Sequence, residues 1–363
     1  MASVSQLQVE TALKEVVDPY LETDLVSTKC IKSITVDGDR VVVQVVLGYP
    51  AKGAIAAQAE KLRERILRIS GVKSADVQIE SKIVSHGVQK GVKQIPGVKN
   101  VIAVASGKGG VGKSTTAVNL ALALSAEGAS VGILDADIYG PSQPRMLGTR
   151  AKPESKDGKS MEPVVSYHLQ SMSIGYLIDE ETPMIWRGPM VTQALEQLLK
   201  DTNWKDVDYL IVDLPPGTGD TQLTLAQRVP VTGAVIVTTP QDIALLDARK
   251  GLKMFEKVEI PVLGIIENMS THICSKCGHE EHIFGAGGGL RMAEQYEVDF
   301  LGSLPLDIRI RVDSDDGRPT VVADPDGRLA QIYREIARRV SAKLSLTRKD
   351  FSSKFPNIVI QNT

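Results

Sequence analysis

The residues best suited to chemistry form a glycine-rich stretch at positions 106–115, with the sequence SGKGGVGKST. This stretch fits the pattern G-x-x-x-x-G-K-[ST], in which backbone N–H groups surround phosphates, the lysine neutralises the outer phosphates and the hydroxyl binds Mg²⁺. An apolar run at 100–105 precedes it, and a helix-forming run at 116–124 follows it. The N-terminus of such a helix would direct its dipole and its free amides at the phosphates. The sequence therefore predicts a site for a nucleoside triphosphate with Mg²⁺.

Every residue of this loop after the serine is a candidate for contacting the nucleotide. The candidates are Gly107, Lys108, Gly109, Gly110, Val111, Gly112, Lys113, Ser114 and Thr115. We expect Lys113 to neutralise phosphate charge and Ser114 to bind magnesium. Lys108 is an additional cation one residue after the first glycine, which an ordinary loop of this kind does not need. It indicates a variant of the loop.

Two further apolar runs end in acidic residues. Asp135 and Asp137 come at the end of one run, and Asp213 ends another. Ligands of open α/β sheets collect at the carboxyl ends of the strands, so we expect these carboxylates near the nucleotide, where they could hold Mg²⁺ through water or orient the attacking water. The segment at 214–220, LPPGTGD, has the proline and glycine content of a switch loop that turns sharply near the terminal phosphate.

The spacing of Cys274 and Cys277 predicts a metal site, because two thiolates three positions apart can hold one metal centre. One pair supplies only half of a four-thiolate site, and a symmetric dimer would supply the other half, enough for a [4Fe–4S] cluster. Zinc bound within one chain is the main alternative, with His272, His279 and His282 nearby. The short spacing between Cys277 and His279 argues against zinc, because zinc modules place their second ligand pair farther along. A redox pair or no metal are the remaining alternatives.

Taken in order, these motifs resemble those of one family. The variant loop, DADIYGPS at 135–142, DLPPGTGD at 213–220, ENMS at 267–270 and the cysteine pair follow the order of the Mrp/ApbC-type iron–sulfur cluster carriers, which are deviant Walker A ATPases. The resemblance covers nearly the whole chain. It implies a slow ATPase, active as a homodimer, that binds a [4Fe–4S] cluster and transfers it to apoproteins, with cluster-assembly scaffold proteins as further partners.

The resemblance also implies roles for single residues. Lys108 would reach across the dimer interface to the partner's nucleotide and, with Lys113, take part in catalysis. Asp137 would orient the attacking water, and Asp213 would switch with the nucleotide state. Asn268 occupies the position at which relatives recognise adenine.

The composition and the order of the predicted elements indicate the domain organisation. The chain has 363 residues, 42% of them hydrophobic and 24% charged, with a formal net charge of −2, which suits a globular protein of about two domains and gives no support to a nucleic-acid partner. We expect a small α+β domain at 1–86, a linker at 87–99, an ATPase domain at 100–346 and a tail at 347–363. The expected fold is α/β, a P-loop NTPase with a mainly parallel, doubly wound sheet behind the small domain.

The small domain resembles the iron–sulfur assembly domain that many bacterial members carry in front of their ATPase. We expect helices at 4–17 and 54–69 and strands at 31–36, 41–47 and 75–79. Domains of this type often have an acidic residue after Asp-Pro and a cysteine after the second strand, whereas this chain has Tyr20 after Asp18-Pro19 and LGYPA at 47–51. A metal role for the domain is therefore not expected. Cys30 is expected to pack in its interior.

A second class of function competes with cluster transfer, namely an ATPase that positions itself on a membrane or nucleoid. Its basis is the predicted helix at 328–344, which has one apolar stripe and several basic residues. The same stripe suits a helix packed on a sheet, which we favour. No signal peptide and no run of about 18 apolar residues is present, so the expected location is the cytoplasm, without a membrane partner.

Overall fold

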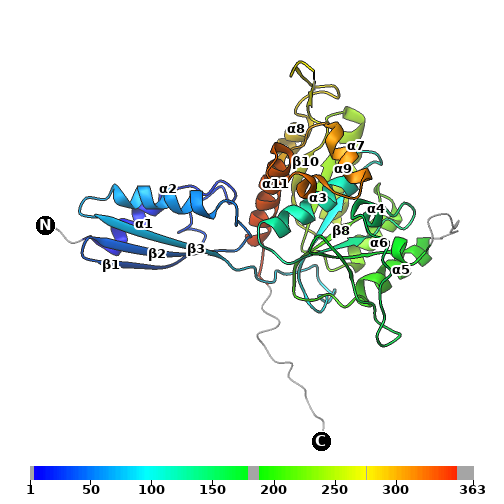
Figure 1. Ribbon diagram of the computed structural model, residues 1–363, viewed down its shortest axis with the longest axis horizontal. Coiled ribbons are helices and arrows are strands. Elements are labelled where there is room, and N and C mark those ends of the chain that lie inside the picture. Colours follow the sequence, from blue (N-terminus) through cyan, green and yellow to red (C-terminus); the bar gives the residue numbers. More distant parts are fainter. Residues whose placement is uncertain (1–3, 179–187, 275, 350–363) are drawn as a thin grey trace, which may run out of the picture.

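The computed structural model describes residues 4–178, 188–274 and 276–349. The first part of the chain forms a three-stranded sheet of order β1-β2-β3, with helices α1 (Gln6–Lys14) and α2 (Ile55–Leu67) on one face (Figure 1). The strands are β1 (Ile31–Asp37), β2 (Arg40–Leu47) and β3 (Ser74–Ser81). Alternate residues of β2 are buried beneath the helices, as expected for a sheet with one covered face. Cys30 is half-buried against this core.

The rest of the chain forms an eight-stranded sheet of order β13-β10-β9-β4-β8-β5-β7-β6. All its neighbouring strands are parallel except the edge pair β6 and β7. Its strands are β4 (Val98–Ala105), β5 (Val131–Asp135), β6 (Val164–Ser166), β7 (Leu169–Ser173), β8 (Val207–Asp213), β9 (Gly233–Thr238), β10 (Val262–Glu267) and β13 (Phe300–Ser303). The central strands are buried on both faces, which confirms the mainly parallel, doubly wound sheet that the apolar runs predict.

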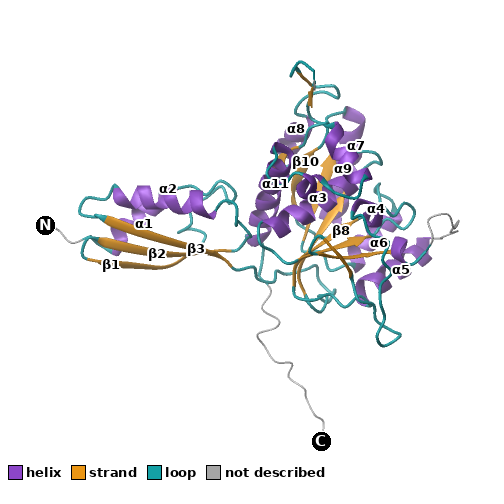
Figure 2. Ribbon diagram, viewed as in Figure 1, coloured by secondary structure: helices purple, strands orange, loops and turns teal. Residues whose placement is uncertain are grey.

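Helices cover both faces of this sheet (Figure 2). One face packs against α3 (Lys113–Ala126), α10 (Thr320–Ala323) and α11 (Arg328–Ser345). The other packs against α5 (Gly188–Lys200), α6 (Asp220–Arg228) and α7 (Asp242–Lys257), with α8 (Gly288–Gln295) beside α7. The shorter elements are α4 (Gln143–Met146), the 3₁₀ turn η1 (Ile174–Tyr176), β11 (His272–Ile273), β12 (Glu280–Glu281) and α9 (Ile308–Asp315).

The apolar stripe of α11 lies in the core, as favoured from the sequence. Leu329, Tyr333, Ile336, Val340 and Leu344 are all buried. The stripe is therefore used for packing and is not free to bind a membrane. Within the described ranges, none of the helices has the length and apolar content needed to cross a bilayer.

Two differences between the predicted elements and the structure change the large sheet. β4 begins at Val98, inside the expected linker, because Val98 pairs in register with Val207 of β8. The stretch at 149–170, for which no element was predicted, contains β6 and the first residues of β7. Most of the predicted tail, 350–363, lies outside the described residues.

A buried carboxylate joins the small sheet unit to the large one. Glu127 ends α3, and its side chain accepts hydrogen bonds from the backbone N–H of Gly53 (2.8 Å), from Arg334 Nε (2.7 Å) and from Arg338 Nη1 (3.0 Å). The backbone N–H of Lys52 also donates to the carbonyl of Glu127, at 3.1 Å. The loop after β2 is thus held at the end of the helix that begins at Lys113.

Glu127→Ala is expected to lower the free energy of unfolding by about 3–5 kcal/mol, because it leaves two largely buried arginines without their counter-charge. Urea denaturation measures this loss. Glu60→Ala is the matched control, because Glu60 pairs only with Arg63 on the surface and should cost no more than about 1 kcal/mol. An equal loss of unfolding free energy in the two variants would show that Glu127 does not stabilise the contact between the two sheet units.

Candidate functional site

The glycine-rich loop connects β4 to α3 and takes the backbone shape that its glycines allow. Gly110 and Gly112 have φ angles of 83° and 81°, in the left-handed region that favours glycine. Gly112 caps the N-terminus of α3, so the first amides of the helix face the loop. Crowding requires glycine here as well, since a Cβ at Gly112 would lie 2.2 Å from Nδ2 of Asn268.

Asn268 follows β10 and contacts the loop directly. Its Nδ2 donates to the carbonyl of Val111 at 2.8 Å, and its Oδ1 accepts from the backbone N–H of Met269 at 2.9 Å. The other end of the loop is equally confined, because a Cβ at Gly107 would lie 2.1 Å from the carbonyl carbon of Asp247 in α7. The loop is therefore fixed on both sides by neighbouring strand and helix ends.

A buried ion pair lies at the start of α3. The Nζ of Lys113 pairs with Asp213 at the end of β8, and it also donates to the hydroxyl of Ser114 at 3.1 Å. The second carboxylate oxygen of Asp213 accepts from Nε2 of Gln143 at 2.9 Å. Lys113 and Asp213 are almost fully buried, so the pair is shielded from solvent. Gln143 could not be predicted from the sequence, because a glutamine at the start of a short helix does not by itself indicate a contact with a distant aspartate.

The two aspartates after β5 have different surroundings. Asp135 is fully buried and accepts from the backbone N–H groups of Ser142 (2.9 Å) and Gln143 (3.0 Å) and from the hydroxyl of Ser173 (3.1 Å). Burial, and next the charge of Asp213, raise the pKa of Asp135 to about 7. Asp137 is half-buried, and burial also raises its pKa. Asp135 thus holds the loop in shape, while Asp137 has a partly open side chain.

The structure brings most of the predicted nucleotide residues to one edge of the sheet. The loop, Asp137, Asp213 and Asn268 come from the ends of β4, β5, β8 and β10. Lys108 is exposed on the outside of the loop, where its carbonyl accepts from the hydroxyl of Ser106 at 3.0 Å. An exposed lysine at this position is free to meet a partner molecule.

The cysteines lie at the tip of a small hairpin made by β11 and β12, just after β10. The backbone N–H of Cys274 donates to the carbonyl of His279, and that of Gly278 donates to the carbonyl of Cys274, both at 2.9 Å. Cys274 is half-buried and Cys277 is exposed. Backbone N–H groups of Cys277 and Lys276 that donate to the sulfur of Cys274 lower the pKa of its thiol. A lowered pKa favours the thiolate, the form that binds metal.

The zinc alternative receives no support from this geometry. Within the part of the chain that the structure describes, no three His, Cys, Asp or Glu side chains converge as a metal site. The ring of His279 lies 3.6 Å from Glu281 at an exposed position, and His272 and His282 each face a backbone carbonyl. At this hairpin, one chain presents the two thiols of Cys274 and Cys277.

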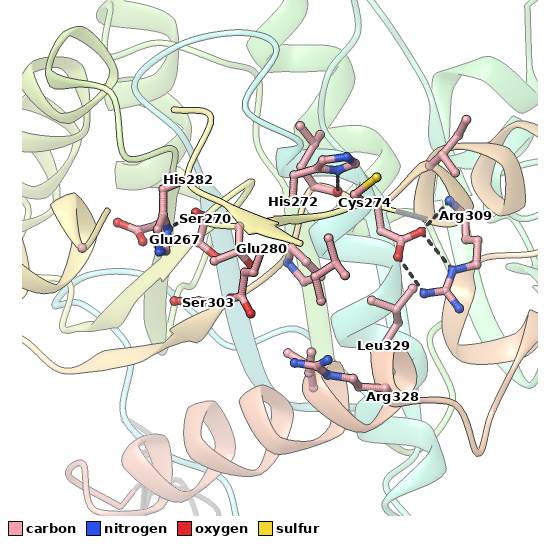
Figure 3. Close-up of a pocket in the computed structure, with 18 of the residues that line it drawn as sticks. Glu267, Ser270, His272, Cys274, Glu280, His282, Ser303, Arg309, Arg328 and Leu329 are labelled. Carbon is pink, nitrogen blue, oxygen red and sulfur yellow. Dashed lines mark hydrogen bonds and ion pairs between the residues drawn. The ribbon is translucent and has the colours of Figure 1, made fainter. Parts of the chain in front are cut away.

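A cavity of about 830 Å³ opens beside Cys274 (Figure 3). Its walls are the hairpin, the end of β13 and the starts of α8, α9 and α11. Apolar side chains line much of it, and Arg309 and Arg328 also contribute to its wall. Arg309 forms a two-point ion pair with Asp307. One of the candidate thiols therefore borders a cleft large enough for part of another molecule.

Comparison with known proteins matches both parts of the chain. The sequence model of the ParA family described as NUBPL iron-transfer P-loop NTPase matches residues 97–341, and that of the iron-sulfur cluster assembly protein family matches residues 6–79. A protein of Escherichia coli K12 named iron-sulfur cluster carrier protein is 54% identical over 327 residues, which are 90% of this chain and 89% of the relative. A mouse protein named iron-sulfur cluster transfer protein NUBPL is 52% identical over 74% of this chain and 84% of its own length.

Solved structures support the same fold. A nucleotide-binding protein of Archaeoglobus fulgidus in complex with ADP is 37% identical, with a TM-score of 0.56 over 64% of this chain and 90% of its own. The cell division ATPase MinD of Pyrococcus furiosus aligns over 66% of this chain and 98% of its own, with a TM-score of 0.51 and 21% identity, and so shows the fold alone. The sequence prediction of a P-loop NTPase fold is confirmed.

Gly112→Ala is expected to weaken MgADP binding at least about tenfold, because the substitution adds strain at a positive φ and drives a Cβ into Asn268. Isothermal titration calorimetry measures the affinity. The control is Gly158→Ala, outside the site, which shares the positive φ of Gly112 but where an added Cβ meets no atom within 4 Å, and the expected change is within about twofold. The loop geometry would be refuted if both variants bound MgADP equally well.

Proposed function

The chain belongs to the NUBPL-type iron-transfer P-loop NTPase family, and we propose that it carries iron–sulfur clusters to apoproteins under the control of ATP. The observation that carries the proposal is the placement of two different sites on one sheet edge. The phosphate loop follows β4, and the hairpin with Cys274 and Cys277 follows β10. The names of the relatives point to the same cargo.

For the nucleotide, the fit rests on the loop itself. The left-handed glycines and the start of α3 direct backbone N–H groups to one place, which suits the phosphates of ATP. We assign Ser114 to Mg²⁺, and Gly107 to Thr115 to phosphate contacts. Bound Mg²⁺ would neutralise charge on the outer phosphates. Asp137, half-buried at the end of β5, is the residue proposed to orient water in a slow hydrolysis.

Lys113 and Asp213 supply a switch in this proposal. Their buried ion pair uses the same ammonium that a phosphate would attract. If Lys113 paired with a phosphate, Asp213 would lose this partner, would keep the hydrogen bond from Gln143, and could help to hold Mg²⁺. Because Asp213 leads directly into the loop at 214–220, a change of its partner would move that loop. Asn268, beside the loop, is proposed to contact the adenine with the amide hydrogen not directed at Val111.

For the cluster, we propose that two chains each contribute Cys274 and Cys277 to one bridging [4Fe–4S] cluster. The exposure of Cys277 and the lowered pKa of Cys274 suit thiolates offered to a second molecule. Lys108, exposed on the loop, would act on the partner's nucleotide in the same homodimer. Recipient apoproteins and cluster-assembly scaffold proteins are the proposed partners, and the cavity beside Cys274 gives a recipient segment room to approach.

The test is to purify the protein without oxygen, reconstitute it with iron and sulfide, and measure both per dimer for wild type and for the double variant Cys274→Ala/Cys277→Ala. About four irons and four sulfides per wild-type dimer are expected, and the double variant should lose them while it still binds MgADP. Cys30→Ala is the control, because Cys30 belongs to the core of the small sheet unit. A cluster retained by the double variant, or about one zinc per wild-type monomer, would contradict the proposal.

A further inference from the structure

The cysteine hairpin is too small to hold its own shape. β11 and β12 contain two residues each, and they pair His272 with Glu281 and Ile273 with Glu280. An isolated two-stranded hairpin is at best marginally stable in water, even with longer strands. Most of this hairpin is also exposed, so a packed core does not fix it. The position of the thiols must depend on attachments to the rest of the molecule.

Two histidines provide such attachments, His272 in β11 and His282 directly after β12. Nδ1 of His272 lies 3.1 Å from the carbonyl oxygen of Leu306, and Nδ1 of His282 lies 3.0 Å from the carbonyl oxygen of Ser270. A backbone carbonyl can only accept a hydrogen bond, so Nδ1 must carry the proton in both rings. Figure 3 shows both contacts as dashed lines, with His282 drawn against Ser270 and Cys274 farther along the hairpin.

The segments that receive these hydrogen bonds are themselves fixed. The backbone N–H and the hydroxyl of Ser270 both donate to the carbonyl of Leu304, at 3.0 and 3.1 Å, and the backbone N–H of Leu306 donates to the carbonyl of Thr271 at 2.7 Å. Leu304 follows β13, and Ser270 comes two residues after Asn268, which contacts the phosphate loop. The histidines thus anchor the hairpin to the ends of two sheet strands.

We propose that His272 and His282 are positioning residues for the cluster thiols, holding the hairpin in the orientation in which two chains can share a cluster. That the thiols bind a cluster rests on the proposed function. The anchoring of the hairpin rests only on the hydrogen bonds of the two histidines. In this proposal the histidines form hydrogen bonds to backbone carbonyls and are not metal ligands. An imidazole that binds a metal can also donate its other N–H to a carbonyl. The experiment must therefore separate an anchor from a ligand.

The first measurement uses the protein without cluster, so it does not depend on loading. Hydrogen exchange, resolved to the amides of Cys274 and Gly278, reports how often the hairpin opens, because both amides donate within it. His282→Ala should speed exchange at both amides about fivefold through loss of one part-buried hydrogen bond. His282→Asn, whose side-chain amide can replace the Nδ1–H donor, should return exchange to within about twofold of wild type.

His279→Ala is the matched control, because His279 lies on the same hairpin with an exposed side chain and a ring contact only to Glu281. It should leave the exchange of both amides unchanged. His272→Ala and His272→Asn repeat the pair of variants on the other side of the hairpin, in β11. Exchange that is the same in His282→Ala, His279→Ala and wild type would overturn the anchoring role, whatever the protein binds.

The second measurement uses the loaded protein and follows the loss of iron to a chelator, together with the absorption spectrum. An anchor predicts faster loss in His282→Ala, wild-type loss in His282→Asn, and one spectrum for all variants. If His282→Asn has normal exchange without cluster but an altered spectrum or no cluster, the ring is a ligand and the proposal is wrong. If wild type takes up no cluster, the proposed function fails while the exchange result still decides the anchoring.

Discussion

The contact of Asn268 with the phosphate loop is the constraint on which the rest of the site depends. Nδ2 of Asn268 donates to the carbonyl of Val111 and leaves no room for a Cβ at Gly112, so the loop and the end of β10 have one relative placement. Two residues later, the carbonyl of Ser270 accepts a hydrogen bond from the ring of His282, and the backbone N–H of Ser270 donates to the carbonyl of Leu304. One strand end therefore sets the geometry of the nucleotide loop and of the cysteine hairpin together.

The helix α3 extends this arrangement to the small sheet unit. It begins at Lys113, whose side chain is paired with Asp213, and ends at Glu127, whose carboxylate holds Arg334, Arg338 and the backbone of Gly53. The loop after β2 contacts the large sheet unit here, through the backbone of Lys52 and Gly53. This loop is therefore part of the interface between the two sheet units.

Much of the site could be predicted from the sequence because its signals are local. The glycine spacing, the apolar runs and the acidic strand ends each depend on neighbouring residues, and the parallel sheet then brings Asp137, Asp213 and Asn268 to the loop. Gln143, Glu127 and the anchoring role of His282 could not be predicted. Each acts through a partner distant in sequence or through the backbone, and residue type alone does not indicate such a partner. The start of β4 at Val98 was missed for the same reason, since its register is set by β8.

The phosphate loop and the cysteine hairpin both contact the segment that follows β10, and we infer that they are coupled through it. This coupling can be tested by the rate at which a chelator removes iron from the loaded wild-type dimer, measured without nucleotide, with MgADP and with a non-hydrolysable MgATP analogue. We expect the rates to differ among the three conditions, because a nucleotide at the loop acts on Asn268 and so on the segment that anchors the hairpin. Identical rates with the nucleotide shown to be bound would contradict it.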